Sequence, residues 1–170
     1  MKKFKYLYSV LVLIGFSLST QAQYTAKQLQ SRAQFQAQQM MDSLVKGRHT
    51  GYIAFIYPKL AQMAGGKESM VTGLDKVRQN MVKKGEQFVR IKAGNAGACI
   101  KEKNELQCVL QQTTTVKTLQ GEKTLRTHII CISTDNGKRW TFIDTGGAKP
   151  EMIRQAFPNV SASLVFPPLN

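Results

Sequence analysis

The chain has 170 residues, a formal net charge of +14 and a hydrophobic content of 42%. The chain has no internal repeats and no low-complexity linker, so its length predicts a single domain. The basic excess fits nucleic acid, anionic membranes or acidic polysaccharides as partners. However, the cations are scattered, and the densest clusters are pairs such as Lys83-Lys84. We therefore expect a solvated basic surface and no nucleic-acid partner.

The first 22 residues have the three parts of a secretory signal peptide. Three lysines open the segment, Tyr6 to Leu18 is apolar, and Thr20-Gln21-Ala22 forms a small-x-small cleavage site. An apolar run of 13 residues is too short for a membrane-spanning helix, so we favour cleavage over an uncleaved anchor. The sequence predicts an exported protein, periplasmic or extracellular, that begins near Gln23, carries a net charge of +11 and has no membrane span after cleavage.

The next part of the chain has helical periodicity. Apolar residues recur every three or four positions from Ala26 to Val45 and from Lys67 to Lys84, which predicts two amphipathic helices. Gly47 and Gly85 follow them as typical helix stops. In the second helix we expect an apolar stripe to pack in the core rather than to line a cofactor site: Met70, Leu74, Val77 and Met81.

Between these helices, the segment HTGYIAFIYPKLAQMAGG predicts a short helix capped by Thr50. Pro58 disfavours a helical conformation at Tyr57 and predicts a break there. The residues Lys59 to Ala64 fit either a helix or a short extended piece.

After Gly85 the period changes to two, which predicts an antiparallel sheet. The expected strands are Gln87–Lys92, Ala98–Lys101, Leu106–Leu119, Glu122–Ser133 and Lys138–Thr145. Gly94 and Gly97 predict a bulge or bend in one long first strand. A short helix is expected over Glu151 to Ala156. This order predicts an α+β domain with helices packed on one face of the sheet.

Three two-residue turns would set the register of this sheet: Lys103-Asn104, Gln120-Gly121 and Asn136-Gly137. The last is the strongest signal, because Asn and Gly tolerate the positive φ angles of a tight hairpin turn. The turns place these residues on one face: Cys99, Cys108, Leu110, Gln112, Ile129, Cys131, Trp140, Phe142 and Asp144. The opposite face holds Ile100, Val109, Gln111, Thr113, His128, Ile130, Ile132, Thr141 and Ile143.

The same register sets Cys99 opposite Cys108, which makes the two candidates for a cross-strand disulfide in an oxidising compartment. Cys131 is expected only as a diagonal neighbour of Cys108, too far for an unstrained bridge. The alternative is three buried free thiols, and the residues leave both open. We expect no metal site, because the cysteines form no CxxC and have no nearby His.

Apolar residues on both faces mean that the face away from the helices needs its own cover. The C-terminal tail could supply that cover, and so could a second copy of the chain. We predict a homodimer through the sheet.

The element order, together with YPKLAQMAGGKESM and STDNGKRWTFIDT, resembles the nuclear-transport-factor-2-like superfamily, also called SnoaL-like. The resemblance covers Ala26 to Thr145, and the tail PNVSASLVFPP resembles that of small exported bacterial members. It implies a strongly curved sheet that forms a cone around a pocket, and often dimerisation through the outer sheet face.

Enzymes of this superfamily place a carboxylate in the apolar cone, sometimes with His or Tyr, and burial tunes its pKa. The acid of such a pocket would be Asp144, although a strand-end Asp more often caps the following turn. His128 is expected on the opposite face, His49 in a solvated loop, and Asp42 and Asp75 on the surface. The remaining pocket candidates are Tyr52, Tyr57, Gln112, Trp140 and Phe142.

The leading hypothesis is therefore an exported module without catalytic activity that binds a small apolar or amphipathic ligand and needs no cofactor. An isomerase, hydrolase or dehydratase of the SnoaL-like type, with Asp144 as its acid or base, is the alternative. A third hypothesis makes the domain a dimeric interaction partner at the cell envelope.

Overall fold

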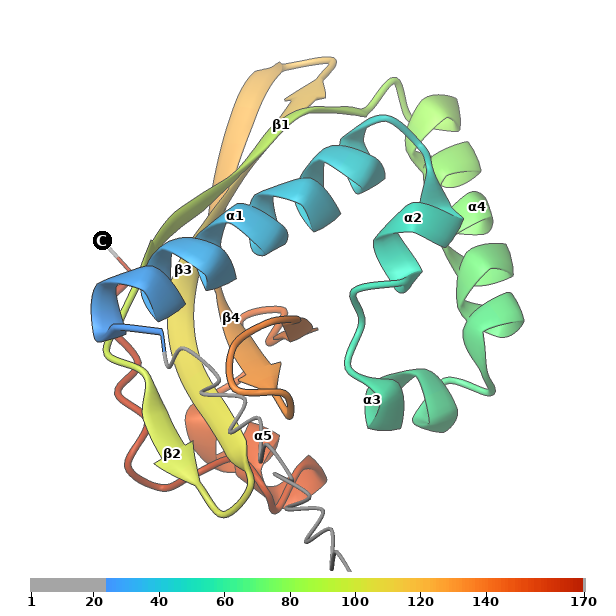
Figure 1. Cartoon of the computed structure of the whole chain (residues 1–170). Helices are drawn as coiled ribbons and strands as arrows, with labels where there is room; N and C mark the ends of the chain where they lie inside the picture. Colours follow the sequence, from blue (N-terminus) through green and yellow to red (C-terminus); the bar gives the residue numbers. More distant parts are fainter. Residues whose placement is uncertain (1–23, 170) are drawn as a thin grey trace, which may run out of the picture.

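The structure is a computed structural model that describes residues 24–169 (Figure 1). The predicted signal peptide lies outside the described residues. Within them, no helix is both long and apolar enough to cross a membrane.

Within residues 24–169, four helices precede the sheet and a fifth follows it. The helices are α1 (Ala26–Val45), α2 (His49–Ile53), α3 (Pro58–Met63), α4 (Lys67–Lys83) and α5 (Pro150–Ala156). The strands are β1 (Gln87–Ala96), β2 (Ile100–Glu102), β3 (Glu105–Thr118), β4 (Gly121–Ser133) and β5 (Thr141–Asp144). This order confirms the predicted α+β domain.

Glycines end both long helices, as predicted. Gly47 (φ +68°) follows α1 and Gly85 (φ +67°) follows α4, both in the left-handed conformation that glycine adopts most easily. The prediction that Thr50 caps the second helix is wrong, because α2 begins one residue earlier and Thr50 lies inside it. The open question over Lys59–Ala64 is resolved as helix, with Pro58 in the first turn of α3.

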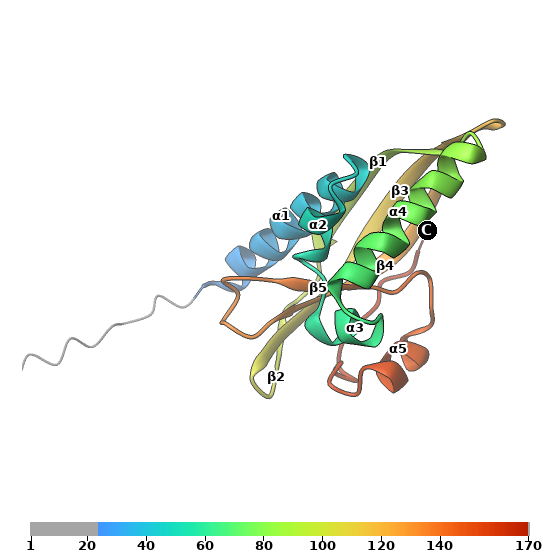
Figure 2. The same cartoon turned by 90° about the vertical axis from the view of Figure 1, so that its right-hand side faces the viewer.

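The sheet is antiparallel with the order β1-β3-β4-β5, and β2 also pairs with β3. Strands β1 and β2 follow each other along the same edge of β3, and the pairing of β1 is irregular between Ala93 and Ala96. The predicted bend near Gly94 is thus confirmed. The described sheet is twisted but not strongly curled (Figure 2), so the strong curvature that the resemblance implies is not seen.

One predicted turn is displaced, and this changes the register between β3 and β4. Thr118 pairs with Gly121, so the turn residues are Leu119-Gln120 rather than Gln120-Gly121. Cys108 therefore lies opposite Cys131 and not opposite Ser133. Because the shift is two residues, every side chain keeps its predicted face.

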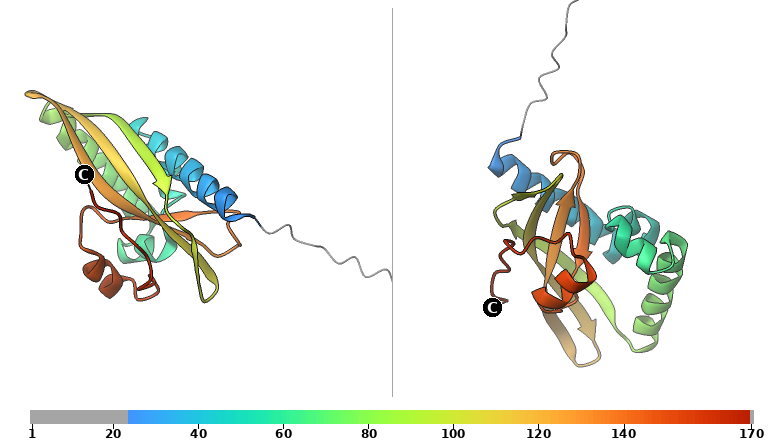
Figure 3. Two further views of the ribbon diagram at one scale, coloured as in Figure 1. Left: turned by 90° about the vertical axis from the view of Figure 1, so that its left-hand side faces the viewer. Right: turned by 90° about the horizontal axis from the view of Figure 1, so that it is seen from below.

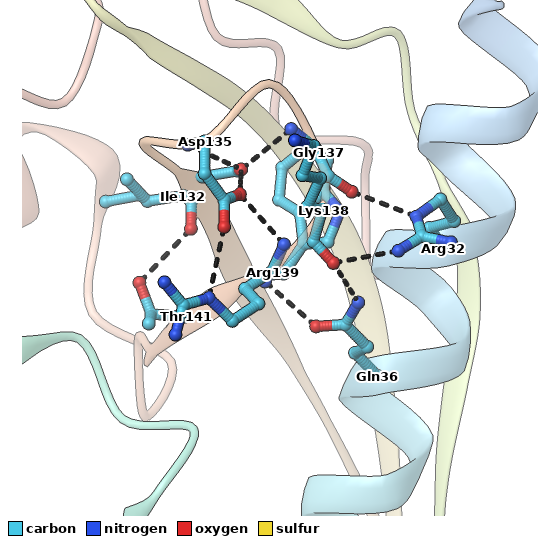
Figure 4. Close-up of polar contacts among 10 residues, drawn as sticks. Arg32, Gln36, Ile132, Asp135, Gly137, Lys138, Arg139 and Thr141 are labelled. Atoms are coloured by element: carbon cyan, nitrogen blue, oxygen red, sulfur yellow. Dashed lines mark hydrogen bonds and ion pairs between the residues drawn. The ribbon is translucent and has the colours of Figure 1, made fainter. Parts of the chain in front are cut away.

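The turn at Asn136-Gly137 forms as predicted, with positive φ angles at both residues. The pairing around it is shorter than expected, because β5 begins only at Thr141. Asp135 holds the residues between the turn and β5. Its carboxylate accepts hydrogen bonds from the backbone N–H (2.8 Å) and the guanidinium (3.1 Å) of Arg139. Figure 4 shows this network.

Helix α1 binds the same turn through side-chain amides. The amide of Gln36 donates to the Lys138 carbonyl (3.0 Å) and accepts from the Trp140 N–H (2.9 Å), so it pairs with the turn as a strand would (Figure 4). Arg32 donates to the carbonyls of Gly137 (3.0 Å) and Lys138 (2.9 Å). These bonds fix the turn against α1.

The two sheet faces form two separate cores, in agreement with the predicted alternation. The face under α1 packs against that helix, and its fully buried members include Leu110, Ile129 and Phe142. The opposite face packs against α5 and the C-terminal tail, with Val109, Ile130, Ile132 and Ile143 against Ile153, Phe157, Val160 and Leu164. Figure 3 shows α5 and the tail on this second face.

The tail is therefore the cover that the second face was expected to need. Arg154 of α5 fixes the tail through hydrogen bonds to the carbonyls of Ser161 (3.3 Å) and Leu164 (3.2 Å). The apolar residues that motivated the predicted homodimer are packed within one chain, and the dimer stays a prediction.

Candidate functional site

Helix α4 does not bury its apolar stripe. No residue of α4 is buried, and Val77 is 50% exposed. The prediction that the stripe packs in the core holds for Met70, which packs against the core beside α1, and is wrong for Leu74, Val77 and Met81. In Figure 1 the helix stands beside the sheet, with α3 at its one end and the chain leading into β1 at the other.

A cavity of about 460 Å³ lies between α4, the end of α1 and the first residues of β1. Its apolar lining consists of Leu44, Val45, Leu74, Val77, Met81, Val82 and Phe88. Its polar lining includes His49, Arg78, Glu86, Gln87 and Lys117. We call this cavity the α4 cleft. Its volume and mostly apolar walls are typical of small-molecule sites.

His49 is one of the polar residues that line the cleft. It is the first residue of α2 and only 6% exposed, so the expected solvated loop position is wrong. Its Nδ1 lies 2.6 Å from the Oδ1 of Asp75, which sits on the exposed surface of α4 as predicted. This contact ties α4 to α2 and occupies the Asp75 carboxylate.

Asp144 lies at the end of β5 and is held by three donors. Its Oδ2 accepts from Gln112 Nε2 (2.9 Å), while its Oδ1 accepts from the Gly146 N–H (2.9 Å) and the Thr127 hydroxyl (3.3 Å). The bond to Gly146 is the turn cap that a strand-end Asp commonly makes. These hydrogen bonds give Asp144 and Gln112 a structural role at the end of β5.

Tyr52 belongs to the core on the same side of the sheet. Burial, and to a lesser extent the Asp144 charge, raise the pKa of the Tyr52 hydroxyl well above its ordinary value. Trp140 and Phe142 are 1% and 0% exposed in this core, and the Trp140 indole N–H has no hydrogen-bond partner among the described residues. Tyr52, Gln112, Trp140, Phe142 and Asp144 do not line the α4 cleft.

Tyr57 is separated from these residues, because it packs with the second core beside Phe157. Burial and the nearby Glu105 charge raise the pKa of its hydroxyl, which accepts a hydrogen bond from Asn159 Nδ2 (3.0 Å). The predicted candidates therefore do not form one pocket.

His128 lies on the sheet face opposite Asp144, as predicted. Its Nε2 donates to the Pro167 carbonyl (2.7 Å), and its ring packs edge-on against Phe166. These contacts hold the C-terminal tail and separate His128 from both Asp144 and the cleft. Asp42, half-buried on α1, accepts a hydrogen bond from Gln38 Nε2 (2.8 Å).

Cys108 of β3 pairs with Cys131 of β4, Cys99 directly precedes β2, and all three cysteines are free thiols in the structure. The expected diagonal placement of Cys131 is wrong, because it pairs directly with Cys108. A hydrogen bond with Cys108, together with burial, raises the pKa of the Cys99 thiol. The disulfide between Cys99 and Cys108 stays a prediction. Among residues 24–169, no group of three His, Cys, Asp or Glu residues could hold a metal ion.

Sequence reasoning found the α4 stripe but missed the cleft, together with Arg78, Phe88 and Lys117 at its walls. The size of the residues along each stripe was a signal for this difference. The stripe of α1 contains Ala33 and Ala37, which permit close packing on the sheet and are fully buried. The stripe of α4 consists of larger residues, and the glycine of this helix, Gly73, does not line the cleft.

No family model matches this chain, and no curated protein matches it. A solved structure from Catenulispora acidiphila is similar, with 15% identity and a TM-score of 0.47, over 67% of this chain and 91% of that one. The structure of Aln2 from a Streptomyces species is also similar, with 16% identity and a TM-score of 0.46, over 72% of this chain and 91% of that one.

Proposed function

We propose that this chain is an exported, non-catalytic module that binds a small apolar or amphipathic ligand in the α4 cleft. The observation that carries the proposal is the open apolar stripe of α4, which faces a cavity instead of a packed partner. Contiguous exposed apolar surface in a soluble domain is typical of a binding site. A ligand in the cleft would remove this surface from water.

The geometry supports binding more than catalysis. A catalytic carboxylate has to reach a substrate, whereas Asp144 does not line the cleft and accepts three hydrogen bonds from its own domain. The alternative function remains an isomerase, hydrolase or dehydratase of the SnoaL-like type. Asp144→Asn separates the two: a binding module keeps its fold and ligand uptake, whereas the enzyme loses its turnover.

We also propose that the chain is a divergent member of the nuclear-transport-factor-2-like superfamily with an opened cone. The order of helices before an antiparallel sheet and the stretches that carry the resemblance support this assignment. The signal-peptide pattern supports export. N-terminal sequencing of the exported form tests it: Gln23 as the first residue is expected, and an intact Met1 would contradict it.

Binding in the cleft is tested with a neutral fluorescent probe, N-phenyl-1-naphthylamine, and the variant Val77→Asp. The substitution places a carboxylate on the apolar wall at a position that is already half exposed. We expect it to weaken probe binding at least about tenfold, because an apolar ligand would desolvate the new charge. Circular dichroism checks that the variant stays folded.

Thr72→Asp is the matched control, because it adds the same charge to an exposed position of α4 that does not line the cleft. Its probe affinity should equal that of the wild type. Equal affinity of all three proteins, or no probe binding at all, would contradict the proposed site. Native mass spectrometry of protein from its own source then tests for a copurified ligand.

A further inference from the structure

The charged groups around the α4 cleft are unevenly engaged. Asp75 contacts His49, as described above, whereas Arg78, three residues later on the same helix, makes no hydrogen bond or ion pair with residues 24–169. Its guanidinium can donate five hydrogen bonds in a planar fork that matches a carboxylate. An unengaged Arg at the wall of an apolar cavity is a candidate anion receptor.

Gly47 determines where this guanidinium lies. A Cβ at position 47 would overlap the Arg78 guanidinium, so the side chain rests directly on the backbone at the end of α1. The left-handed φ of +68° at Gly47 also favours glycine. The Arg78 guanidinium thus lies against the residue that ends α1, two positions before His49.

The remaining lining charges lie on the strand side. Lys117 of β3 pairs with Gln87, the neighbour of Glu86, so these two charges share the wall formed by the start of β1 and the end of β3. The cleft lining contains two permanent cations, Arg78 and Lys117, and one carboxylate, Glu86. The lining therefore has an excess of positive charge, and neither cation forms an ion pair with residues 24–169.

We propose that the α4 cleft binds a single-chain amphipathic carboxylate, with the head group paired to Arg78 and the hydrocarbon chain against Leu74, Val77 and Met81. This inference rests on the proposed function and adds the chemical class of the ligand. The apolar walls would cover the chain, and the guanidinium would donate to both oxygens of the carboxylate. The rest of the cavity, about 460 Å³ in total, leaves room for such a chain.

The test compares three probes with twelve-carbon chains: dodecanoate and dodecyltrimethylammonium, each below its critical micelle concentration, and dodecanol, below its solubility limit. Binding is measured by displacement of N-phenyl-1-naphthylamine and by calorimetry. We expect dodecanoate to bind at least about tenfold more tightly than dodecanol, since charge-assisted hydrogen bonds are the stronger kind. Dodecyltrimethylammonium should bind most weakly.

Arg78→Gln should abolish this preference for the carboxylate, because the loss of affinity should be much larger for dodecanoate than for dodecanol. Arg78→Lys should retain part of it, because the charge remains but the planar fork is lost. Lys76→Gln is the matched control: it removes one charge from an exposed position of α4 outside the cleft lining and should preserve the preference.

The outcomes separate this inference from the proposed function. Equal binding of dodecanoate and dodecanol, unaffected by Arg78→Gln, would overturn the ligand class and leave the binding module intact. An equal loss of the carboxylate preference in Lys76→Gln would mean that the preference comes from the general basic charge of α4. This result would also overturn the ligand class. If none of the probes binds, the proposed function itself fails.

Discussion

Helices α1 and α4 are the two long helices of the part of the chain that the structure describes, and both carry an apolar stripe at helical spacing. In α1 the stripe is closed: Ala33, Ala37, Met40 and Met41 are at most 1% exposed. In α4 no residue is buried. The periodicity of the two helices is alike, so the difference must come from what each helix finds opposite its stripe.

Two features bring α1 close to the sheet. Alanines at the contact let the helix backbone approach the strands, and glutamines then bond to strand backbone. The amide of Gln38 donates to the Ile91 carbonyl (2.9 Å) and accepts from the Ala93 N–H (2.9 Å), so it pairs with the outer edge of β1 as a further strand would. An edge strand whose polar groups are occupied in this way is protected from other partners.

Helix α4 lacks both features. Its stripe is made of Leu, Val and Met, of which Met70 packs against the core, and its Asp75 contacts His49 of α2. An apolar stripe thus favours burial, but its spacing alone does not identify the partner that covers it. In α1 that partner is the sheet, and in α4 we propose that it is a ligand.

The largest expected contrast comes from one substitution made in each helix. Met40→Ala should lower the free energy of unfolding by about 2–5 kcal/mol, because it leaves a cavity in a fully buried site. Met81→Ala removes the same atoms from the partly exposed wall of the cleft and should cost less than about 1 kcal/mol. Urea unfolding of both variants measures the difference. Equal losses would show that the α4 stripe is packed.

A smaller contrast is expected between two glutamines. Gln38→Ala leaves the Ile91 carbonyl and the Ala93 N–H of β1 without their side-chain partner and should cost about 1–3 kcal/mol. Gln79→Ala, at an exposed position of α4, should change stability by no more than about 0.5 kcal/mol. Hydrogen exchange at the Ala93 amide should accelerate in Gln38→Ala only; unchanged exchange there would disprove the proposed edge pairing.

The sequence was sufficient where the chemistry is local. Helix ends at Gly47 and Gly85 and the turn at Asn136-Gly137 were predictable, because positive φ angles select glycine and asparagine. The face of each strand residue was also predictable, since alternation survives an error of two residues in register. The displaced turn at Leu119-Gln120 affected only which residues lie opposite each other.

The site was less predictable, because its residues come from elements that only the fold brings together. Leu44, Leu74 and Phe88 lie on α1, α4 and β1, and no spacing in the sequence connects them. His49 looked solvated because its carboxylate partner, Asp75, is 26 residues away. Side-chain amides that replace strand partners, such as those of Gln36 and Gln38, likewise resemble ordinary surface residues in the sequence.

The smallest expected effect concerns pH and the closed core beside α1. The pKa of Tyr52 is raised in the folded chain, by burial first and by the Asp144 charge second, so the folded state binds the phenolic proton more tightly than the unfolded state. A raised pKa means that this contribution to stability is fully present below the unfolded pKa of about 10 and is lost as the pH rises above it.

Between about pH 10 and 11, ionisation of Tyr52 in the unfolded chain should therefore reduce the free energy of unfolding, by at most about 1.4 kcal/mol per pH unit. Tyr52→Phe removes this part of the pH dependence, while Tyr24→Phe, outside this core, should leave the profile of the wild type unchanged. Urea unfolding at a series of alkaline pH values measures all three proteins. Identical slopes in Tyr52→Phe and the wild type would mean that the Tyr52 hydroxyl is exposed to solvent. The contrast between a covered α1 side and an open α4 side would then not extend to α2.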